Sequence, residues 1–413
     1  MEKITNFLTD NAYVQDPRSS CLTVSLNDFL NDDLKNDLKN VSYADVLIKY
    51  PNWEKNSDFF KFINESTLDE LRNNKRFFLF FDCTTEGYSP LFESPYFDIL
   101  YYNCKKYNIS PNKIFYVSSN AQDSKNIKNF NKKNQITESI NVFSFPAFEL
   151  ATKDIVIGTP RRMNLDAYLQ TTLSNVNSQF TGEKLFISLS RVNRDYRSLA
   201  QYLLSQSESS KYAIISHDIF RENLDFLADR WRHQFKVLRD EPKENIRSWL
   251  KSLPIIADTR DFQTNHALNS NSHLHHQTLF QIVNETKVED LYRTTLFYSE
   301  KTFKPIAHFQ PFLIYGQQGC NRGLQEFGYK LYTDWFDYSF DDEVDHEYRY
   351  VKLLKEVETA VNKLKNLSKK EQIQWRFKNL EILKHNYTVL ENNEYTKKVI
   401  NQIGQTISTY INQ

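Results

Sequence analysis

The sequence predicts an α/β protein of two doubly wound, Rossmann-like domains that face a cleft, followed by a helical C-terminus. A short, continuous apolar run at 76–82 is typical of a strand covered on both faces, as in a parallel sheet, and the segment 184–190 and the apolar run 311–315 indicate further buried strands. Helix-like segments alternate with these runs, which is the pattern of βαβ units. The length of 413 residues is too great for one simple core, so two domains are expected.

The first predicted domain covers residues 1–177. Its opening, to about residue 75, is polar and carries a short helical pattern at 26–38. Further elements are expected in chain order: a strand at 76–82, a helix at 95–107, a strand at 113–118, an exposed loop or helix at 120–135, and a strand at 140–145. A more polar stretch, 150–177, follows, so the domain joint is placed near residue 178.

The second predicted domain covers residues 178–345, and helices occupy residues 346–413. Its expected elements are strands at 184–190 and 212–216, a helix at 198–205, a helical region at 221–253, a polar loop at 258–277, a strand at 278–284, a helix opening at residue 300, and a strand at 311–315. Apolar residues then recur with helical spacing at about 347–366, 369–386 and 393–412. These last helices are expected to pack on the domains.

Composition excludes several classes of protein. The 52 basic and 52 acidic side chains balance, which argues against a dedicated nucleic-acid binder. The four cysteines are scattered without a C-x-x-C pair, so neither a disulfide framework nor a cysteine zinc site is expected. The N-terminus lacks a signal-peptide core, and no apolar run of about 18 residues occurs. The sequence therefore predicts a cytoplasmic protein without a membrane span.

Residues 297–341 are the most informative stretch. Four of the eight glycines of the chain, Gly316, Gly319, Gly323 and Gly328, fall within thirteen residues here. They follow the strand at 311–315, and the pair Glu300 and Lys301 opens a helix just upstream. A helix start, a strand and a glycine turn together predict a site for a phosphate-bearing ligand at the edge of an α/β sheet.

Arginines follow directly on the strand at 184–190. A loop at the carboxyl end of a parallel strand is where a phosphate would bind, and Arg191, Arg194 and Arg197 offer permanent charge and bidentate geometry. The plainer interpretation is a solvated turn with arginines on a helix surface.

For Glu300 and Lys301 the plainer interpretation is a first-turn acid with an exposed lysine. In the functional interpretation, Glu300 accepts hydrogen bonds from a ribose and Lys301 neutralises a diphosphate.

Other candidate residues carry weaker signals. Glu86 follows the strand at 76–82 and is a candidate general base if it points into the cleft. The histidines at 266, 273, 275 and 276 lack the spacing of a metal site, and a flexible polar loop is favoured for them. Asp258 and Asp261 resemble an Asp-x-Asp motif only loosely. The phosphate-binding P-loop, the dinucleotide fingerprint and the nucleophile elbow are absent.

Two blocks of the sequence resemble a family of glycosyltransferase-like proteins of phages, giant viruses and bacteria. The first ends the strand at 184–190 and continues into Asn-Arg-Asp-Tyr-Arg at 193–197. The second reads Ser-Glu-Lys-Thr-Phe-Lys-Pro-Ile at 299–306, then Pro-Phe at 311–312, a glycine turn, and Gly-Tyr-Lys-Leu-Tyr at 328–332. The same order is similar to the donor half of the α-1,3/4-fucosyltransferases, which implies a GT-B-like fold. Tyr329 to Tyr332 and Tyr338 depart from the usual pattern.

The resemblance implies roles for particular residues. It places the donor nucleotide sugar on residues 184–342, with an arginine of the 191–197 segment and Lys301 on the diphosphate and Glu300 on the ribose. Asn284 and Glu285 would lie near the donor, and Glu86 would be the base. The full expected donor-binding set is Arg191, Arg194, Arg197, Asn284, Glu285, Ser299, Glu300, Lys301, Lys304, Gly316 and Gly319. No metal-binding residue is expected.

The sequence thus predicts a glycosyltransferase that moves a sugar from a nucleotide-sugar donor to a glycan, glycolipid, protein or modified-DNA acceptor. By analogy with the fucosyltransferases it would be inverting and metal-independent, with no required cofactor, although a divalent ion could stimulate it. One alternative is a phage-type transferase that acts on a hydroxymethylated pyrimidine in DNA. Another is a non-catalytic relative that binds a nucleotide or a carbohydrate.

Overall fold

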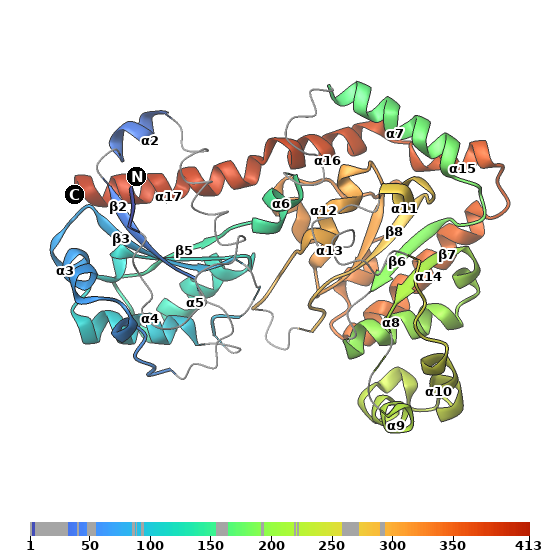
Figure 1. The fold of residues 1–413 in the computed structure, drawn as a ribbon, viewed down its shortest axis with the longest axis horizontal. Helices are drawn as coiled ribbons and strands as arrows, with labels where there is room; N and C mark the ends of the chain where they lie inside the picture. The colour runs from blue at the N-terminus through green and yellow to red at the C-terminus, as the bar shows by residue number, and fades with distance from the viewer. Residues whose placement is uncertain are drawn as a thin grey trace. The chain divides into compact units, whose positions relative to one another are not determined.

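The computed structural model describes residues 2–4, 32–38, 41–47, 55–84, 87, 89–91, 95–153, 164–190, 194–218, 220, 223–257, 272–289 and 294–413 (Figure 1). The chain forms two compact units. The first consists of residues 1–150, 291–298 and 393–413, and the second of residues 151–290 and 299–392. The chain therefore leaves the second unit after Asp290, contributes residues 291–298 to the first unit, and re-enters the second unit at Ser299.

The first unit is built on a parallel sheet of five strands. These are β1 (Glu2–Ile4), β2 (Ser42–Leu47), β3 (Phe77–Cys83), β4 (Ile114–Ser118) and β5 (Asn141–Ser144), in the order β1-β2-β3-β4-β5. All seven residues of β3 and all five of β4 are buried. Their continuous apolar runs are explained by this burial, because each strand has helices on both faces.

Helices cover both faces of this sheet. The helical elements of the unit are α2 (Asp32–Asp37), η2 (Phe60–Phe62), α3 (Glu65–Asn73), α4 (Tyr96–Tyr107), η3 (Pro111–Lys113), α5 (Asp123–Asn134), α6 (Ala147–Thr152, which spans the unit boundary) and α17 (Glu394–Asn412). Leu79 and Phe81 of β3 pack with α3, α4 and α5. Phe78 and Phe80, which alternate with them, pack with α2 and α17 on the other face (Figure 1).

The second unit contains a parallel sheet of four strands. These are β6 (Phe186–Ser190), β7 (Ala213–His217), β8 (Phe280–Asn284) and β9 (Phe312–Tyr315), in the order β7-β6-β8-β9. From β6 the chain first moves outward to β7 and then returns to the other side of β6 with β8 and β9. The order therefore reverses between β6 and β8, and such a switch point is where sheets of this kind bind ligands.

Helices surround the second sheet as well. The helical elements are α7 (Leu165–Gln179), α8 (Asp195–Gln206), η5 (Glu208–Tyr212), α9 (Leu224–Gln234), η6 (Lys236–Leu238), α10 (Lys243–Lys251), α11 (Ser272–His276), α12 (Glu300–Ala307), α13 (Cys320–Gly323), η7 (Leu324–Phe327), η8 (Ser339–Asp342), α14 (His346–Leu364), α15 (Lys369–Arg376) and α16 (Leu380–Asn392). Helices α8 and α14 pack together on one face of the sheet, whereas α7, α11, α12 and α16 cover the other (Figure 1).

The predicted α/β class, with two Rossmann-like parts and a helical C-terminus, is confirmed by these sheets and helices. The strands expected at 76–82, 113–118, 140–145, 184–190, 212–216, 278–284 and 311–315 are all present, with ends that differ by two residues at most. The compact units are divided differently from the predicted domains. Helix α7 and helices α14 to α16 belong to the second unit, and α17 returns to the first.

The helical region expected at 221–253 is confirmed and consists of α9, η6 and α10, with Pro242 directly before α10. Two other local predictions were wrong. The helix expected at 369–386 ends at Arg376, and α16 begins at Leu380. The buried guanidinium of Arg376 donates hydrogen bonds to the carbonyl oxygens of His275, Thr278 and His308 and anchors the end of α15, and Asn379 Oδ1 accepts from the Ile382 N–H where α16 starts.

The polar loop expected at 258–277 is a helix in its last part. His275 and His276 lie in α11 and are buried, and His275 stacks on His308 with 4.4 Å between ring centroids. Burial lowers the pKa of His275 to about 3 and that of His276 to about 4, so both rings are neutral at pH 7. His266, Asp258 and Asp261 lie outside the described residues.

None of the helices in the described part of the chain is long and apolar enough to cross a membrane.

Candidate functional site

The candidate site lies at the switch point of the second sheet, where β6 ends at Ser190 and β8 ends at Asn284. The register pairs Ser188 with Ile282 and Leu189 with Val283, so the two carboxyl ends lie next to each other. The segments that follow β6, β8 and β9 all leave from this edge. They carry most of the residues predicted to bind a donor.

A buried polar layer supports the switch point. Ser188 Oγ accepts hydrogen bonds from Gln201 Nε2, at 2.9 Å, and from Asn284 Nδ2, at 3.0 Å. All three side chains are buried between the sheet and α8. Within the residues that the structure describes, Asn284 Oδ1 and the nearby Ser190 Oγ are buried without a hydrogen-bond partner. Unpartnered buried polar atoms destabilise a fold, so their presence at a sheet's ligand-binding edge favours a functional reason.

Glu285 joins the end of β8 to the start of α12. Its carboxylate accepts hydrogen bonds from the backbone N–H of Thr286 at 2.9 Å and of Ser299 at 3.1 Å. It also accepts from Ser299 Oγ at 2.7 Å and Thr302 Oγ1 at 2.5 Å. With four donors and a fully buried side chain, Glu285 holds the site together, and its oxygens are already occupied by the protein.

Arg194 and Arg197 tie the start of α8 to the same segment. Arg197 is 3% exposed, and it donates from Nε to the Glu285 carbonyl at 3.0 Å and from Nη2 to Thr286 Oγ1 at 3.2 Å. Burial lowers the pKa of Arg197 from its usual value. Arg194 is exposed and donates to the Thr286 carbonyl at 2.7 Å. Among the described residues no carboxylate forms an ion pair with Arg197, so its charge is not neutralised by a salt bridge.

The N-terminus of α12 supplies a third charged group. Ser299 caps this helix, and Lys301 Nζ donates to Ser299 Oγ at 3.1 Å and to Glu300 Oε1 at 2.9 Å. Glu300 is only 6% exposed. Burial alone raises the pKa of Glu300, but the charges of Lys301 and Lys304 and the hydrogen bond from Lys301 outweigh it, so the pKa lies below its usual value. Glu300 is therefore a charged acceptor beside a lysine and a helix N-terminus.

His217 aligns three elements beneath the site. It ends β7 and is buried, with Nδ1 2.7 Å from the Ser190 carbonyl and Nε2 3.0 Å from Ser198 Oγ of α8. Burial lowers the pKa of His217 to about 4. A neutral ring must carry its proton on Nδ1 to donate to the carbonyl, and Nε2 then accepts from Ser198. The end of β6 is thereby held against α8.

The glycine turn after β9 is fixed by buried charged groups. Arg349 donates to the Gly316 carbonyl at 3.1 Å and to the Val288 carbonyl at 2.6 Å, which links this turn to the segment after β8. Asp341 accepts from the backbone N–H of Asn321 at 3.2 Å and of Arg322 at 3.0 Å. Gly319 has a φ of 76°, a left-handed conformation in which glycine carries no steric penalty.

The structure brings together most of the residues that the sequence singled out. Arg194, Arg197, Asn284, Glu285, Ser299, Glu300 and Lys301 belong to one connected set of segments, and Gly316 and Gly319 lie on the adjoining turn. Lys304 lies in the last turn of α12, where its charge acts on Glu300. Arg191 and Glu86 lie outside the described residues, so their predicted roles stay predictions.

Sequence reasoning missed the buried support of the site. Ser188, Gln201 and His217 carry no motif, and only their polarity within apolar strands and a helix could have indicated them. Arg349 lies on α14, a helix for which the sequence predicted only packing on the domains. Tyr338, noted as a departure from the family pattern, is buried and donates a hydrogen bond to the Phe312 carbonyl at 2.9 Å. In the part of the chain that the structure describes, no three His, Cys, Asp or Glu side chains are grouped to hold a metal ion.

Fold and site together define a two-unit α/β protein with a cationic frame at the switch point of its second sheet. No family model matches the sequence. No curated protein is significantly similar to it.

Solved structures with a similar course of the chain have low sequence identity to it. The N-terminal domain of trehalose-6-phosphate phosphatase from Candida albicans is 9% identical, with a TM-score of 0.42, and the match covers 96% of this chain and 78% of that one. A UDP-forming α,α-trehalose-phosphate synthase from Burkholderia xenovorans is 11% identical, with a TM-score of 0.39 and coverage of 93% and 79%. One from Burkholderia vietnamiensis is 13% identical, with a TM-score of 0.39 and coverage of 92% and 76%. Similarity at this level assigns neither ligand nor reaction.

Proposed function

We propose that this protein is a glycosyltransferase that binds the nucleotide-sugar donor at the switch point of its second unit. One observation carries the proposal. Glu285 and Thr286 connect the segment after β6 with the start of α12, and these segments hold Arg194, Arg197 and Lys301 in a fixed arrangement. Three cations at the carboxyl edge of a parallel sheet suit a diphosphate.

The positive charges of Arg194, Arg197 and Lys301 also suit the chemistry of glycosyl transfer. When a glycosidic bond to a nucleoside diphosphate breaks, negative charge develops on the leaving phosphate. Arg197 is buried, held by two hydrogen bonds and forms no salt bridge within the described residues, so it would supply a fixed positive charge to the site and need not reorganise. Lys301 lies in the first turn of α12, where the helix dipole adds to its charge. These fixed cations support a mechanism in which a metal is not required.

Glu300 is the proposed partner of the donor ribose. Its carboxylate is held charged near neutral pH by Lys301, and a charged carboxylate is a strong acceptor for the two hydroxyls of a ribose. The acceptor would bind to the first unit, with Glu86 as general base in an inverting displacement. That last assignment rests on the position of Glu86 after the strand at 76–82 and on the family resemblance.

Binding of nucleoside diphosphates provides the direct test. The melting temperature would be measured with UDP, GDP, CDP and ADP and their sugars, with and without Mn²⁺. Binding to the folded state alone raises apparent stability by mass action, and 100 Kd of ligand adds about 2.7 kcal/mol. A shift with one nucleotide that persists without Mn²⁺ is expected. No shift with any of them would contradict the proposal, and donor hydrolysis without acceptor separates an enzyme from a non-catalytic relative.

A second acceptor class has one observation in its favour. Helix α5 exposes Lys125, Lys128, Lys132 and Lys133, which are spaced to share one face of the helix. Such a face could contact a phosphate backbone, as a transferase acting on modified bases in DNA requires. Binding to double-stranded DNA that weakens steeply with salt would support this acceptor, because each neutralised phosphate releases counterions. Absence of binding at low salt would leave a glycan, glycolipid or protein as the acceptor.

A further inference from the structure

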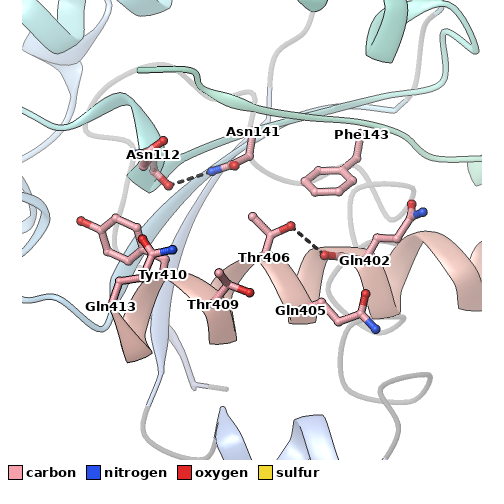
Figure 2. Close-up of a pocket in the computed structure, with 9 residues that line it drawn as sticks. All are labelled: Asn112, Asn141, Phe143, Gln402, Gln405, Thr406, Thr409, Tyr410 and Gln413. Carbon is pink, nitrogen blue, oxygen red and sulfur yellow. Dashed lines mark hydrogen bonds between the residues drawn. The ribbon is translucent and has the colours of Figure 1, made fainter. Parts of the chain in front are cut away.

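A groove lies at the amino edge of the first sheet, away from the edge at which sheets of this kind bind their ligands. It encloses about 510 Å³ between α17 and the start of β5. Asn112 precedes β4 and Asn141 begins β5, which places the groove at the amino ends of the strands. Figure 2 shows the side chains of α17 on one side of the groove and Asn112, Asn141 and Phe143 on the other.

The lining of the groove contains no charged side chain. It consists of amides, hydroxyls and two aromatic rings: Asn112, Asn141, Phe143, Gln402, Gln405, Thr406, Thr409, Tyr410 and Gln413. The α17 members recur at 402, 406, 409 and 413, a spacing that places them along one face of the helix. Residues 399–413 include no Asp, Glu, Lys or Arg, although about four would be expected at the chain's average of 25%. An exposed helix face without charge is unusual for this chain.

The protein uses some of the polar groups of the groove and leaves others available. Asn112 Nδ2 donates to the Glu138 carboxylate at 3.1 Å. Gln402, Gln405 and Thr409 are exposed, and within the described residues their side chains make no hydrogen bond. Asn141 donates from Nδ2 to the Asn112 carbonyl at 2.7 Å, which leaves its Oδ1 as an acceptor. Thr406 donates to the Gln402 carbonyl at 2.8 Å. The groove therefore offers both donors and acceptors, from amides that can each do both.

The rings complete the chemistry of the groove. Phe143 stacks on Phe115 with centroids 6.0 Å apart, and Tyr410 meets Phe78 edge to face at 5.6 Å. Both rings are thus fixed by the core, and both remain partly exposed. A fixed aromatic ring presents an electron-rich face that attracts the C–H groups of a sugar ring, while neighbouring amides bind its hydroxyls.

We propose that this groove binds a neutral oligosaccharide of two or three sugar units. Its volume falls in the range of small-ligand sites, about 300–1,000 Å³. The lack of a cation argues against a nucleotide, a phosphate or a nucleic acid as the occupant. The site is distinct from the donor site of the second unit, and the inference does not depend on the proposed transferase activity.

Saturation-transfer NMR on the full chain tests the proposal. The probes are maltotriose, cellotriose, chitotriose, mannotriose and lactose. Thr409→Arg places a long charged side chain in the groove, and Gln405→Ala removes one amide, both at exposed positions of α17. Asn412→Arg is the matched control, because it adds the same charge to the same helix outside the lining. At least one probe is expected to bind, with affinity reduced fivefold or more by Thr409→Arg, severalfold by Gln405→Ala, and unchanged by Asn412→Arg.

Three results would overturn the proposal. One is absence of saturation transfer to every probe. Another is binding that Thr409→Arg leaves intact, which would locate the sugar elsewhere on the protein. The third is self-association of the parent chain in sedimentation experiments that Thr409→Arg abolishes, which would make the groove an interface between copies. Thermal shifts with UDP, GDP, CDP and ADP, measured in parallel, report on the donor site and are expected to be the same in all variants.

Discussion

Glu285 and Ser299 are joined by two hydrogen bonds, although the chain between them passes through the first unit. Ser299 Oγ lies 2.7 Å from Glu285 Oε2, and its backbone N–H donates to Oε1 at 3.1 Å. Residues 291–298 belong to the first unit, and Asn120 and Asn126 hold them there through the Thr294 carbonyl. The segment that joins the first unit is therefore flanked by Glu285 and Ser299, which are hydrogen-bonded to each other. The buried Glu285 carboxylate thus fixes where α12 starts.

The first prediction concerns this carboxylate. Glu285→Gln replaces one acceptor oxygen with an amide that faces N–H and O–H donors, so at least one buried donor is left without a partner. A loss of roughly 3 kcal/mol in the free energy of unfolding is expected. Urea denaturation followed by tryptophan fluorescence measures it, since four of the five tryptophans lie in the described part of the second unit. Glu183→Gln, at an exposed position of the same unit, should change the midpoint little.

Lys301 is predicted to bind the donor diphosphate. Removing one charge-assisted contact in Lys301→Ala should weaken nucleoside diphosphate binding by about tenfold to a hundredfold and abolish sugar transfer. The fold should persist, because the side chain is 30% exposed and, among the described residues, its ammonium group hydrogen-bonds only to Ser299 and Glu300. Isothermal titration calorimetry with the diphosphate identified in the thermal screen measures the change.

A control for Lys301→Ala must distinguish the loss of a contact with the diphosphate from a loss of the fold. Lys211→Ala removes an exposed lysine of the same unit and should leave binding unchanged. Lys301→Ala also leaves the Glu300 carboxylate without its nearest cation, which would raise the pKa of Glu300. The double variant Glu300→Gln with Lys301→Ala removes that charge, and it should bind the diphosphate no better than Lys301→Ala. Wild-type affinity in the single variant would refute the assignment.

The fold was predictable because its signals are local. The largely apolar runs of β3, β4 and β8 mark strands buried on both faces. The break between α15 and α16 was missed, although Asn379, whose Oδ1 accepts from the Ile382 N–H at the start of α16, is a residue type that favours helix N-caps. The division into units was not predictable, because residues 291–298 and α17 join the first unit only through tertiary contacts.

Candidate residues of the site could be selected from the sequence where charge follows a strand. Arg194, Arg197, Glu300 and Lys301 were selected because each follows or precedes an apolar run, and the structure places them on one connected set of segments. The role of Glu285 as a hub was not visible, because its partners Ser299 and Thr302 are 14 and 17 residues away. His217 was missed because a single histidine at the end of a strand carries no pattern. Its function depends on two groups, Ser190 and Ser198, that only the fold brings to it.

Buried histidines predict how stability depends on pH. The pKa of His217 is lowered to about 4, below its unfolded value near 6.5, so the unfolded chain takes up the proton first. The stabilisation is complete above about pH 6.5 and is lost as pH falls toward 4, by roughly 3 kcal/mol in all. As pH falls from 7 to 4, the free energy of unfolding should decrease less steeply in His217→Gln than in the parent chain. The variant takes up about one proton fewer when it unfolds. His275 and His276, whose pKa values burial also lowers, add to the slope that remains, and His233→Gln, at an exposed position, serves as the control substitution.

Substitutions at Gly316 and Cys320 are predicted to have coupled effects on the free energy of unfolding. A Cβ at position 316 would lie 2.9 Å from Cys320 Sγ, closer than van der Waals contact allows, so Gly316→Ala should cost roughly 2 kcal/mol. Cys320→Ala removes the sulfur, and the double variant should lose at least 1 kcal/mol less than the sum of the two single changes. Gly319 provides the contrast, because a Cβ there meets nothing within 4 Å and its φ is 76°. Gly319→Ala should cost about 1 kcal/mol from backbone strain alone, with no relief from Cys320→Ala. Urea denaturation of the five variants measures these energies, and strict additivity of Gly316→Ala and Cys320→Ala would show that the turn relaxes around the added methyl group.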